Sequence, residues 1–438
     1  QKESEVLNMT LVSNPTQLIS ALDNNEKEVV ITRTMTFASS IYLPAGIDIK
    51  GQAQENGVLP TVFFSHSDGF ILKGDAKISD LTISALQDKK AISLVPQQVR
   101  DNFGQISLEN LIVDGQISMI FRAPTMTAHV DTHNVLVRKA DTRTYLEQPQ
   151  KYGVNVLQGA YTIYNFNPDA NSKITAAISE LNVGQDGQPV IGSGVFVSGF
   201  NDAGGQVVMD KMVLGSVYST GLLPQGAADF ITGGVFVVYG AHVHELYQLG
   251  KTVTYGVNDM VLDAWGTVDK WVVEDEVISY GQSGVGFVNF GTVNDFQAKK
   301  AISTYGVGAR AYNQYDGTLK VGHFAEINTY NDGAVGIQIS KEVGELHIEG
   351  DITTHGGVGQ SLVKGVNVNL PAYAFSIKDG GYLHELHVKG SILSHGDNVT
   401  TVTMEDGGRL DQVAVDGKVA ALGNNSKTFS DETVEKRF

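Results

Sequence analysis

The sequence predicts an all-β protein folded as a parallel β-helix, a solenoid whose coils are about 25 residues long. Three observations predict this fold: a composition of strand and turn residues, the near absence of helix-period segments, and one motif that recurs at a fixed spacing. The 438-residue chain contains 49 glycines and only 18% charged residues, and Val, Ile, Tyr and Phe occur in short runs bounded by Gly, Asn and Asp. We therefore expect one continuous solenoid rather than several domains.

The recurring motif is a Ser or Thr, an aromatic residue and a Gly or Asn. Its first five aromatic positions follow one another at a constant interval, the next comes after one period plus an insertion, and a last copy carries Leu422. Such self-similarity is the signature of a repeat architecture. The aromatic positions are Tyr255, Tyr280, Tyr305, Tyr330, His355 and His395.

The position after the aromatic residue predicts a turn in every repeat. Gly and Asn adopt a left-handed backbone conformation at low cost, so we expect that conformation at this position. The residues concerned are Gly256, Gly281, Gly306, Asn331, Gly356, Gly396 and Gly423.

Alternation along the strand divides each repeat into an inner and an outer face. The aliphatic residue three before the aromatic, such as Ile302, and the Ser or Thr directly before it, such as Thr304, share one face. Burial of the aliphatic column is the evident source of core stability, so this face is predicted to point inward. The aromatic column then points outward, together with the residue four positions before it.

The rest of the chain divides into three parts. Residues 1–40 form an N-terminal segment, in which Asn14 to Asn25 predicts a capping helix with an Asn N-cap, Pro15 at the first helical position and an apolar face. Residues 41–423 form the β-helix, whose N-terminal strands are expected in Ile41 to Gly51, Ala76 to Leu86 and Gly104 to Gly115. Residues 424–438 form a polar tail that we expect to be loose.

An insertion follows His355, over roughly Gln360 to Tyr373. We expect it to be a loop that overhangs the neighbouring coils. Functional residues are concentrated on such loops.

These repeats resemble the pectin-lyase-like right-handed parallel β-helix superfamily, and the likeness extends from the predicted N-terminal helix to about Gly423. The blocks "ISTYGVGARA" and "INTYNDGAVGIQI" are also similar to passenger regions of autotransporter adhesins. The resemblance implies a glycan-related function, because the superfamily includes polysaccharide lyases, glycoside hydrolases, tailspikes and adhesins. The "THGG" and "SHGD" segments lack the preceding Gly and the paired aspartates of polygalacturonase-like members.

Charge and cysteine content restrict the possible partners. The net charge of −17 and the lack of basic clusters argue against a nucleic-acid surface, and they favour a neutral partner over a strongly anionic polysaccharide unless positive charges are locally concentrated. No apolar run is long enough to span a membrane. The absence of cysteine fits a bacterial protein that is extracellular or on the cell surface.

Three carboxylates are the candidate catalytic groups. Glu276, Glu326 and Asp351 occupy the outward position four before the aromatic residue. Stacking at about 5 Å per coil places Glu326 and Asp351 about 5 Å apart, near the separation in retaining glycosidases, and Glu276 and Glu326 about 10 Å apart. The alternative is a solvated strand face that carries carboxylates by chance.

Aromatic residues are the candidate substrate-binding groups. The outward column could form a platform for a long chain ligand, and the alternative is edge stacking that stabilises the coils. Both tryptophans lie in one coil, near Asp263 and the run Glu274 to Glu276, where they could stack on a sugar or pack in the core. The candidate residues are Tyr280, Tyr305, Tyr330, His355, Trp265 and Trp271.

His242 and His244 share one strand face, as a metal-binding pair would. No third ligand is evident in the sequence, so neither a metal nor another cofactor is predicted.

The sequence thus predicts a secreted or surface β-helix protein that binds a carbohydrate chain along an outer groove. One form of this hypothesis adds catalysis of the glycoside hydrolase or polysaccharide lyase type. The alternatives are a non-enzymatic adhesin or passenger module and a tailspike-like depolymerase, and the oligomeric state stays open.

Overall fold

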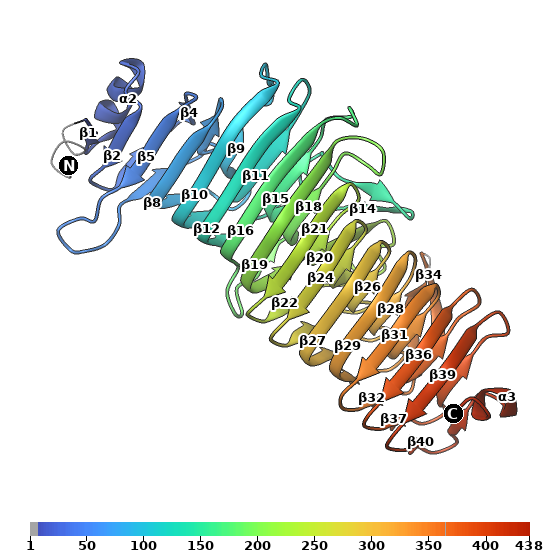
Figure 1. Ribbon diagram of the computed structural model, residues 1–438. Helices are drawn as coiled ribbons and strands as arrows, with labels where there is room; N and C mark the ends of the chain where they lie inside the picture. The colour runs from blue at the N-terminus through green and yellow to red at the C-terminus, as the bar shows by residue number, and fades with distance from the viewer. Residues whose placement is uncertain (1–7, 364) are drawn as a thin grey trace.

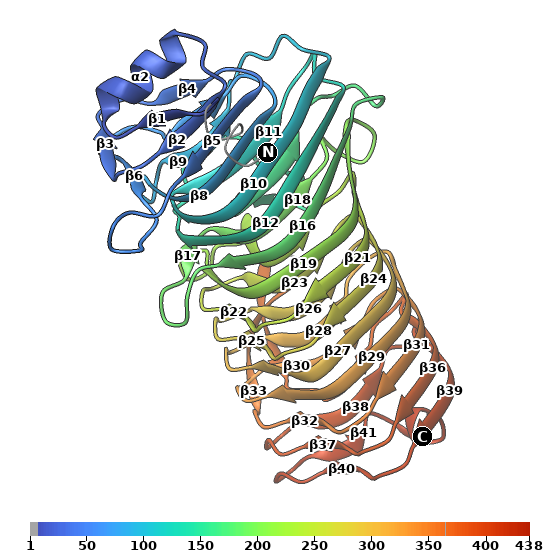
Figure 2. The same cartoon turned by 60° about the vertical axis from the view of Figure 1, so that its left-hand side comes forward.

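The computed structural model describes residues 8–363 and 365–438. Residues 1–7 of the expected N-terminal segment and Lys364 of the insertion lie outside the described residues. Strands stack side by side from one end of an elongated molecule to the other, with helix α2 near the first strands and α3 near the last (Figures 1 and 2). The protein is therefore nearly all β, and its strands form long parallel sheets.

The larger sheet contains 23 strands. In its C-terminal half each coil supplies either one long strand, such as β27, or two shorter ones, such as β24 and β25. Its strands are β1 (Thr10–Val12), β2 (Glu28–Ile31), β3 (Met35–Phe37), β5 (Ile47–Gly51), β6 (Thr61–Phe64), β8 (Ala76–Ser84), β10 (Asn102–Asp114), β12 (Thr127–Lys139), β16 (Lys173–Val183), β17 (Val190–Ile191), β19 (Gln206–Thr220), β21 (Ala241–Gln248), β22 (Thr252–Thr254), β24 (Thr267–Val273), β25 (Val277–Ser279), β27 (Thr292–Thr304), β29 (Thr318–Thr329), β31 (Glu342–Ile348), β32 (Ile352–Thr354), β36 (Tyr382–Val388), β37 (Ile392–Ser394), β39 (Arg409–Val415) and β40 (Val419–Ala421).

The second sheet contains 16 strands and carries the candidate site described below. Its strands are β4 (Ile41–Leu43), β7 (Phe70–Leu72), β9 (Lys90–Leu94), β11 (Gln116–Phe121), β13 (Gln150–Lys151), β14 (Val154–Val156), β15 (Gly159–Asn165), β18 (Ser193–Ser198), β20 (Phe230–Val237), β23 (Asp259–Ala264), β26 (Val285–Asn289), β28 (Arg310–Gln314), β30 (Val335–Ile339), β35 (Phe375–Ile377), β38 (Thr400–Met404) and β41 (Lys427–Phe429). The strands expected from the sequence in both halves of the chain are thus present.

Two antiparallel hairpins interrupt the otherwise parallel pairing of the named strands. The first joins β13 to β14, and β14 continues into the second sheet by pairing with β20. The second joins β33 (Val358–Val363) to β34 (Val366–Pro371), which form a separate two-stranded sheet.

The strand register confirms which side of each repeat points inward. Val277 pairs with Ile302, Ile302 with Ile327 and Ile327 with Ile352, so each step along the stack covers one period of the sequence repeat. These aliphatic side chains are buried, and the hydroxyl column that includes Thr304 is buried with them. Aromatic rings fill the space between the two sheets, with Phe287 stacked on Phe296 at a centroid distance of 4.0 Å.

The expectation of a left-handed backbone at the turn glycines is wrong. Gly256, Gly281 and Gly306 are absent from the residues with positive φ, which occur two residues later, at Asn258, Ser283 and Gly308. Glycine is required for a different reason: a Cβ on Gly281 would collide with the backbone carbonyl oxygen of Gly256, and a Cβ on Gly306 with that of Gly281. The close approach of successive coils, rather than a left-handed backbone, therefore selects glycine there.

Helix α2 (Pro15–Asp23) forms where the sequence predicts it. The Asn14 side chain accepts a hydrogen bond from the Gln17 amide. Leu18 and Ala21 are buried, whereas Ile19 is 45% exposed. At the other end, residues 424–438 are more ordered than a loose tail. Strand β41 pairs with β38, α3 (Glu432–Glu435) follows, and Val434 is buried.

Among the described residues, no helix has the length and apolar character needed to cross a membrane.

Candidate functional site

The main candidate site is a cleft on the outer face of the second sheet, between the two hairpins. It consists of two adjoining cavities of about 280 and 590 Å³. Figure 1 shows β14 and β34 on the same side of the strand stack. We call this site the hairpin cleft, defined by the residues that line both cavities: Tyr152, Arg310, Asn313, Tyr315 and Leu362.

Tyr152 lies at the turn of the first hairpin. It has a φ of 58°, and the following Gly153 has a φ of 79°, which is the backbone of a tight two-residue turn. The turn directs the Tyr152 ring onto the sheet, where its centroid lies 4.6 Å from that of Phe290 and 5.3 Å from that of Trp265. Burial, with the nearby carboxylate of Asp316, raises the pKa of Tyr152, so its phenol stays protonated at neutral pH.

The second hairpin is the insertion predicted from the sequence. It overhangs preceding coils as expected, but as two paired strands rather than a loop. Ser361 Oγ donates to the carbonyl oxygen of Gly308 at 2.9 Å, and the Leu362 amide donates to Ser283 Oγ at 3.3 Å. The hairpin is thus attached to two coils well before it, at positions 53 and 79 residues earlier in the chain.

Arg310 forms the floor of the hairpin cleft. It is only 5% exposed, and its Nη2 donates to the carbonyl oxygen of Leu362 at 3.4 Å. Within the part of the chain that the structure describes, no carboxylate pairs with Arg310, and its Nε has no hydrogen-bond partner. Burial lowers the pKa of Arg310 to about 10, so the guanidinium remains charged at neutral pH.

Asn313 extends the polar floor along the same strand. Its Oδ1 is buried without a hydrogen-bond partner among the described residues. A buried cation and a buried amide oxygen that both lack partners are costly in a folded protein unless a ligand satisfies them. The floor can therefore accept a polar ligand that carries a negative charge and a hydrogen-bond donor.

Arg310 is not among the residues predicted from the sequence, although the repeat contains a signal for it. Strand pairing places Arg310 between Val285 and Val335, and Asn313 between Val288 and Gln338. Arg310 thus occupies a repeat position at which the two neighbouring coils carry valine. A charged residue at an otherwise apolar repeat position indicates a functional site.

The two cavities differ in chemistry. The smaller one is lined by apolar side chains such as Met260, Val288 and Phe290. The larger one is lined by polar side chains of both charges, and Lys378 Nζ lies 3.0 Å from Glu405 Oε1. The polar and charged residues include Gln338, Lys341, Lys378, Asp316, Asp379 and Glu405. The cleft thus passes from an aromatic end to a polar end across Arg310.

The three predicted carboxylates lie elsewhere, on the larger sheet and its turns, and each has a local partner. Glu276 lies 3.7 Å from Lys251 Nζ, and Glu326 accepts a hydrogen bond from Asn328 Nδ2 at 3.0 Å. Asp351 accepts from the backbone amide of Ser391 at 2.7 Å. Because Ile327 pairs with Ile352, Glu326 and Asp351 do lie in adjacent coils, but neither residue lines the hairpin cleft.

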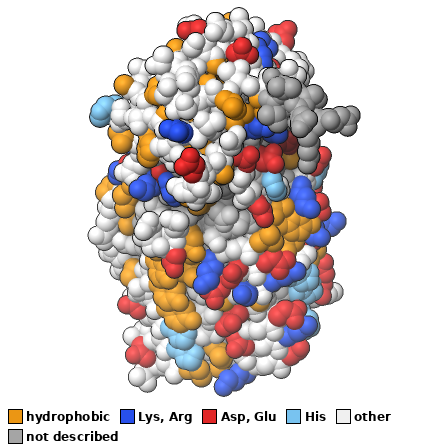
Figure 3. All heavy atoms as spheres, turned by 90° about the vertical axis from the view of Figure 1, so that its left-hand side faces the viewer, with side chains coloured by type: hydrophobic (Ala, Val, Ile, Leu, Met, Phe, Trp, Pro, Cys, Tyr) orange, Lys and Arg blue, Asp and Glu red, His pale blue; other side chains and the backbone are white. Residues whose placement is uncertain are grey.

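The outward aromatic column exists as expected, with Tyr280, Tyr305 and Tyr330 between 42 and 45% exposed. Its rings stack on one another: Tyr305 and Tyr330 are 4.9 Å apart at 12°, and Tyr330 and His355 are 4.8 Å apart at 6°. Figure 3 shows a band of apolar side chains on the lower half of the molecule that continues into histidines. Each ring face is covered by the next ring, so the column offers edges rather than faces, which favours coil stabilisation over sugar stacking.

The two tryptophans are both buried. Trp271 is fully buried between the sheets, where its Nε1 donates to Gln248 Oε1 at 2.7 Å, so it has no free face for a sugar. Trp265 is 4% exposed and packs against Tyr152 beside the hairpin cleft. Both carboxylate oxygens of Asp263 are buried without a hydrogen-bond partner among the described residues, and burial raises the pKa of Asp263.

The structure therefore brings together the predicted insertion and residues that were not predicted as site residues. The insertion and Arg310 meet in one cleft with Tyr152, a residue from a much earlier part of the chain. The predicted carboxylates and the outward aromatic column lie outside it. No protein-family model, curated protein or solved structure matches this chain, so its function has to be inferred from the site itself.

Proposed function

We propose that this protein binds a glycan chain in the hairpin cleft and that Arg310 pairs with an anionic substituent, such as a carboxylate, of one sugar. The observation that carries the proposal is the buried guanidinium of Arg310, which faces both cavities without a carboxylate partner among the described residues. A bound carboxylate would accept two parallel hydrogen bonds from this planar group.

The lining of the cleft supports a sugar as the body of the ligand. Tyr152, Phe290 and Tyr315 provide aromatic surface to the lining, and Asn313 and Gln338 provide planar amides. Sugars present apolar C–H faces and many hydroxyl groups, so a site for them needs both kinds of surface. The two adjoining cavities, of about 280 and 590 Å³, together have room for more than one sugar residue.

The proposal refines the ligand class inferred from the net charge. A chain with a charge of −17 disfavours a polyanion over most of its surface. Asp316, Asp379 and Glu405 line the larger cavity beside Arg310, Lys341 and Lys378, so its charges balance. The preference for an acidic sugar therefore rests on the buried Arg310, which has no carboxylate partner among the described residues. A glycan with spaced acidic groups fits these conditions better than a densely charged one.

The proposal also includes the finer description of the fold and location. We infer a right-handed parallel β-helix of the pectin-lyase-like type, with coils of about 25 residues and α2 covering its N-terminal end. The constant register and the burial of Leu18 and Ala21 in α2 support this description. A glycan-binding solenoid of this kind would act outside a bacterial cell or on its surface.

Binding to a matched pair of ligands tests the proposal. Isothermal titration calorimetry would compare a uronic-acid oligosaccharide with the same oligosaccharide after methyl esterification, which removes the charge and keeps the sugar. We expect the acidic form to bind at least about tenfold more tightly, and Arg310→Gln to abolish the difference. Arg409→Gln, at an exposed arginine of the larger sheet, is the control and should bind as the wild type does. Equal affinity for both forms in the wild-type protein would contradict the proposal.

A turnover assay on the same oligosaccharides separates binding from catalysis. Release of reducing ends or of unsaturated products would add an enzymatic activity to the binding function, and its absence would favour the adhesin alternative. Glu326→Gln and Asp351→Asn should leave binding unchanged, because both residues lie outside the cleft.

A further inference from the structure

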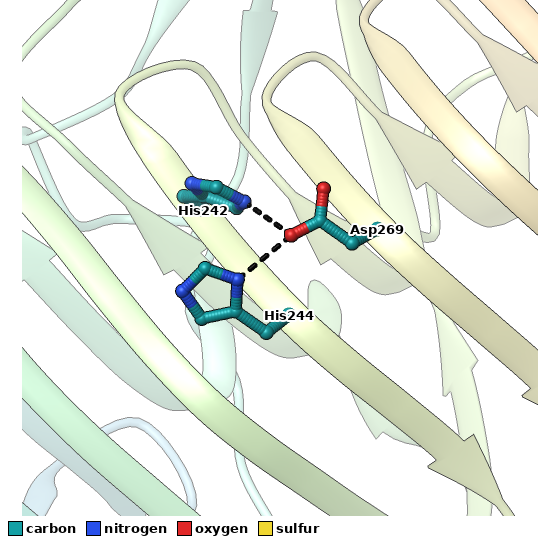
Figure 4. Close-up of side chains that lie close together, drawn as sticks. All are labelled: His242, His244 and Asp269. Carbon is teal, nitrogen blue, oxygen red and sulfur yellow. Dashed lines mark hydrogen bonds and ion pairs between the residues drawn. The ribbon is translucent and has the colours of Figure 1, made fainter.

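A second polar cluster lies on the outer face of the larger sheet. His242 Nε2 and His244 Nδ1, both from β21, each lie 2.7 Å from the same oxygen of Asp269, Oδ2, on β24 (Figure 4). Figure 4 shows both imidazole rings converging on this carboxylate. It is the one group of three such side chains, within the described parts of the chain, whose candidate ligand atoms all lie within 4.8 Å of one another.

The sheet register accounts for this convergence. Alternation along β21 puts His242 and His244 on the same face, as expected from the sequence. Pairing of Val243 with Val268 places Asp269 beside His244 in the next coil. The third ligand that was not evident in the sequence thus lies one period after the second histidine, one coil away.

Neighbouring groups hold the carboxylate in place. Asn294 Nδ2, from β27, donates to Asp269 Oδ1 at 2.9 Å and leaves Oδ2 directed to the histidines. Asp210 Oδ1 lies 4.0 Å from His244 Nε2, the ring nitrogen that is not bonded to Asp269. Hydrogen bonds to the remaining atoms of metal ligands fix their orientation in known metal sites.

The geometry points to a binding site for a divalent transition metal ion, of the Zn²⁺ class, held by His242, His244 and Asp269. Two imidazole nitrogens and one carboxylate oxygen suit Zn²⁺ and similar ions, whereas Ca²⁺ and Mg²⁺ require oxygen ligands. Bonds of about 2.0–2.1 Å to a tetrahedral ion place ligand atoms about 3.3 Å apart. Small side-chain rotations from the present contacts of 2.7 Å produce that spacing.

The site is accessible to an ion and to a fourth ligand. The three side chains are between 37 and 43% exposed. His242 also borders a groove of about 340 Å³ that is lined by Asp202, Gln206 and Thr267. Three protein ligands and one open position are the arrangement in which zinc also binds water or a substrate atom.

Other histidines in the described residues lack this arrangement. His323 and His347 stack with their rings 4.8 Å apart at 16°, and His355 and His395 do so at 7°. The nitrogens of parallel stacked rings point outward in two separate parallel planes rather than toward a common point. The pair His323 and His347 therefore serves as a matched control.

The test is Zn²⁺ binding by the full chain after dialysis against a chelator. We expect a single site by calorimetry, and Co²⁺ substitution should give the visible absorption of a tetrahedral site. His242→Ala, His244→Ala and Asp269→Asn should each remove this site, and Asn294→Ala should weaken it by about tenfold. The double variant His323→Ala/His347→Ala should bind as the wild type does.

Two results would overturn the assignment. One is a wild-type protein that binds no Zn²⁺ in the micromolar range, and the other is equal binding by the His242→Ala/His244→Ala double variant. The Co²⁺ spectrum is recorded on the wild-type protein, so it tests the metal site even if a variant misfolds. Binding to the methyl-esterified and acidic oligosaccharides is measured separately and does not depend on this site.

Discussion

The Nη2 of Arg310 donates to the carbonyl oxygen of Leu362, 52 residues later in the chain, and so joins the floor of the hairpin cleft to the hairpin above it. At 3.4 Å this is a weak hydrogen bond, and it uses one of the five donors of the guanidinium. Its Nε has no hydrogen-bond partner among the described residues, and the side chain lines both cavities between the two hairpins. A buried cation without a partner lowers the stability of the free protein, and under the proposed function a bound anion would offset that cost.

Replacement of Arg310 by methionine should therefore have opposite effects on stability and on binding. We expect Arg310→Met to raise the free energy of unfolding of the free protein by about 1–3 kcal/mol, because it removes an unpaired buried charge and fills the same space. The same variant should lose its preference for the acidic oligosaccharide. Chemical denaturation and calorimetry measure the two effects, with Arg409→Met as the exposed control. A large loss of stability would show that Arg310 has a structural role instead.

The turn glycines should be intolerant of any side chain. Gly281→Ala and Gly306→Ala each place a Cβ against a carbonyl oxygen of the preceding coil, so we expect a loss of about 2–3 kcal/mol in the free energy of unfolding. Gly357→Ala is the control, since its φ is not positive and its added Cβ meets the Asp397 carbonyl oxygen at 3.3 Å, a tight contact that a shift of a few tenths of an ångström relieves. Equal stability of Gly281→Ala and Gly357→Ala would contradict the close-approach explanation.

The outward aromatic column should contribute to stability and not to glycan binding. Tyr305 stacks on Tyr280 at 5.2 Å and on Tyr330 at 4.9 Å, so Tyr305→Ala removes two ring contacts. We expect a decrease of about 1–3 kcal/mol in the free energy of unfolding, with unchanged affinity in calorimetry. Tyr305→Phe keeps the stack and should be near wild type. A loss of affinity at unchanged stability would instead support a platform role.

Asp259 should make stability depend on pH in the mildly acidic range. Burial raises the pKa of Asp259 to about 6, although Thr232 Oγ1 at 2.6 Å and the Gly256 amide at 2.7 Å donate to its carboxylate. Because the folded state then holds this proton more tightly than the unfolded state does, the free energy of unfolding falls as pH rises from about 4 to about 6. The contribution is about 3 kcal/mol at most, from two pKa units at about 1.4 kcal/mol each.

Denaturation curves at several pH values check this expectation. Asp259→Asn should lose the decrease between pH 4 and 6, because an amide does not titrate there. Asp210→Asn alters a side chain that is 97% exposed and should follow the wild-type pH profile. If Asp259→Asn keeps the full wild-type pH dependence, the cause lies in other carboxyl groups.

Much of the fold could be predicted from local patterns. The interval between Tyr280 and Tyr305 matches the pairing of Val277 with Ile302, and alternation correctly assigned the aliphatic and hydroxyl columns to the interior. The same interval, counted from His244, leads to Asp269, so the sequence could also have predicted that these two residues are neighbours. The predicted role of the turn glycines was wrong. These glycines are required because the backbones of successive coils lie in close contact, and the distance between coils cannot be derived from the conformational preferences of single residues.

The candidate site was predicted less well. The sequence indicated that an insertion lies after His355 and that it overhangs earlier coils, but it did not indicate which residues lie beneath it. Glu326 and Asp351 were selected because they lie in adjacent coils, yet each is bonded to a local group and neither lines the cleft.

The sequence by itself determined the repeat, its register and the direction of each side chain, because these depend on the alternation of a strand and on a constant number of residues per coil. Only the tertiary structure decided that Tyr152 and Leu362 cover Arg310. These three residues come from segments far apart in the chain, and the hairpins that carry two of them depart from the repeat. Their contact depends on how far each hairpin extends across the sheet. The repeat period of the sequence does not determine that distance.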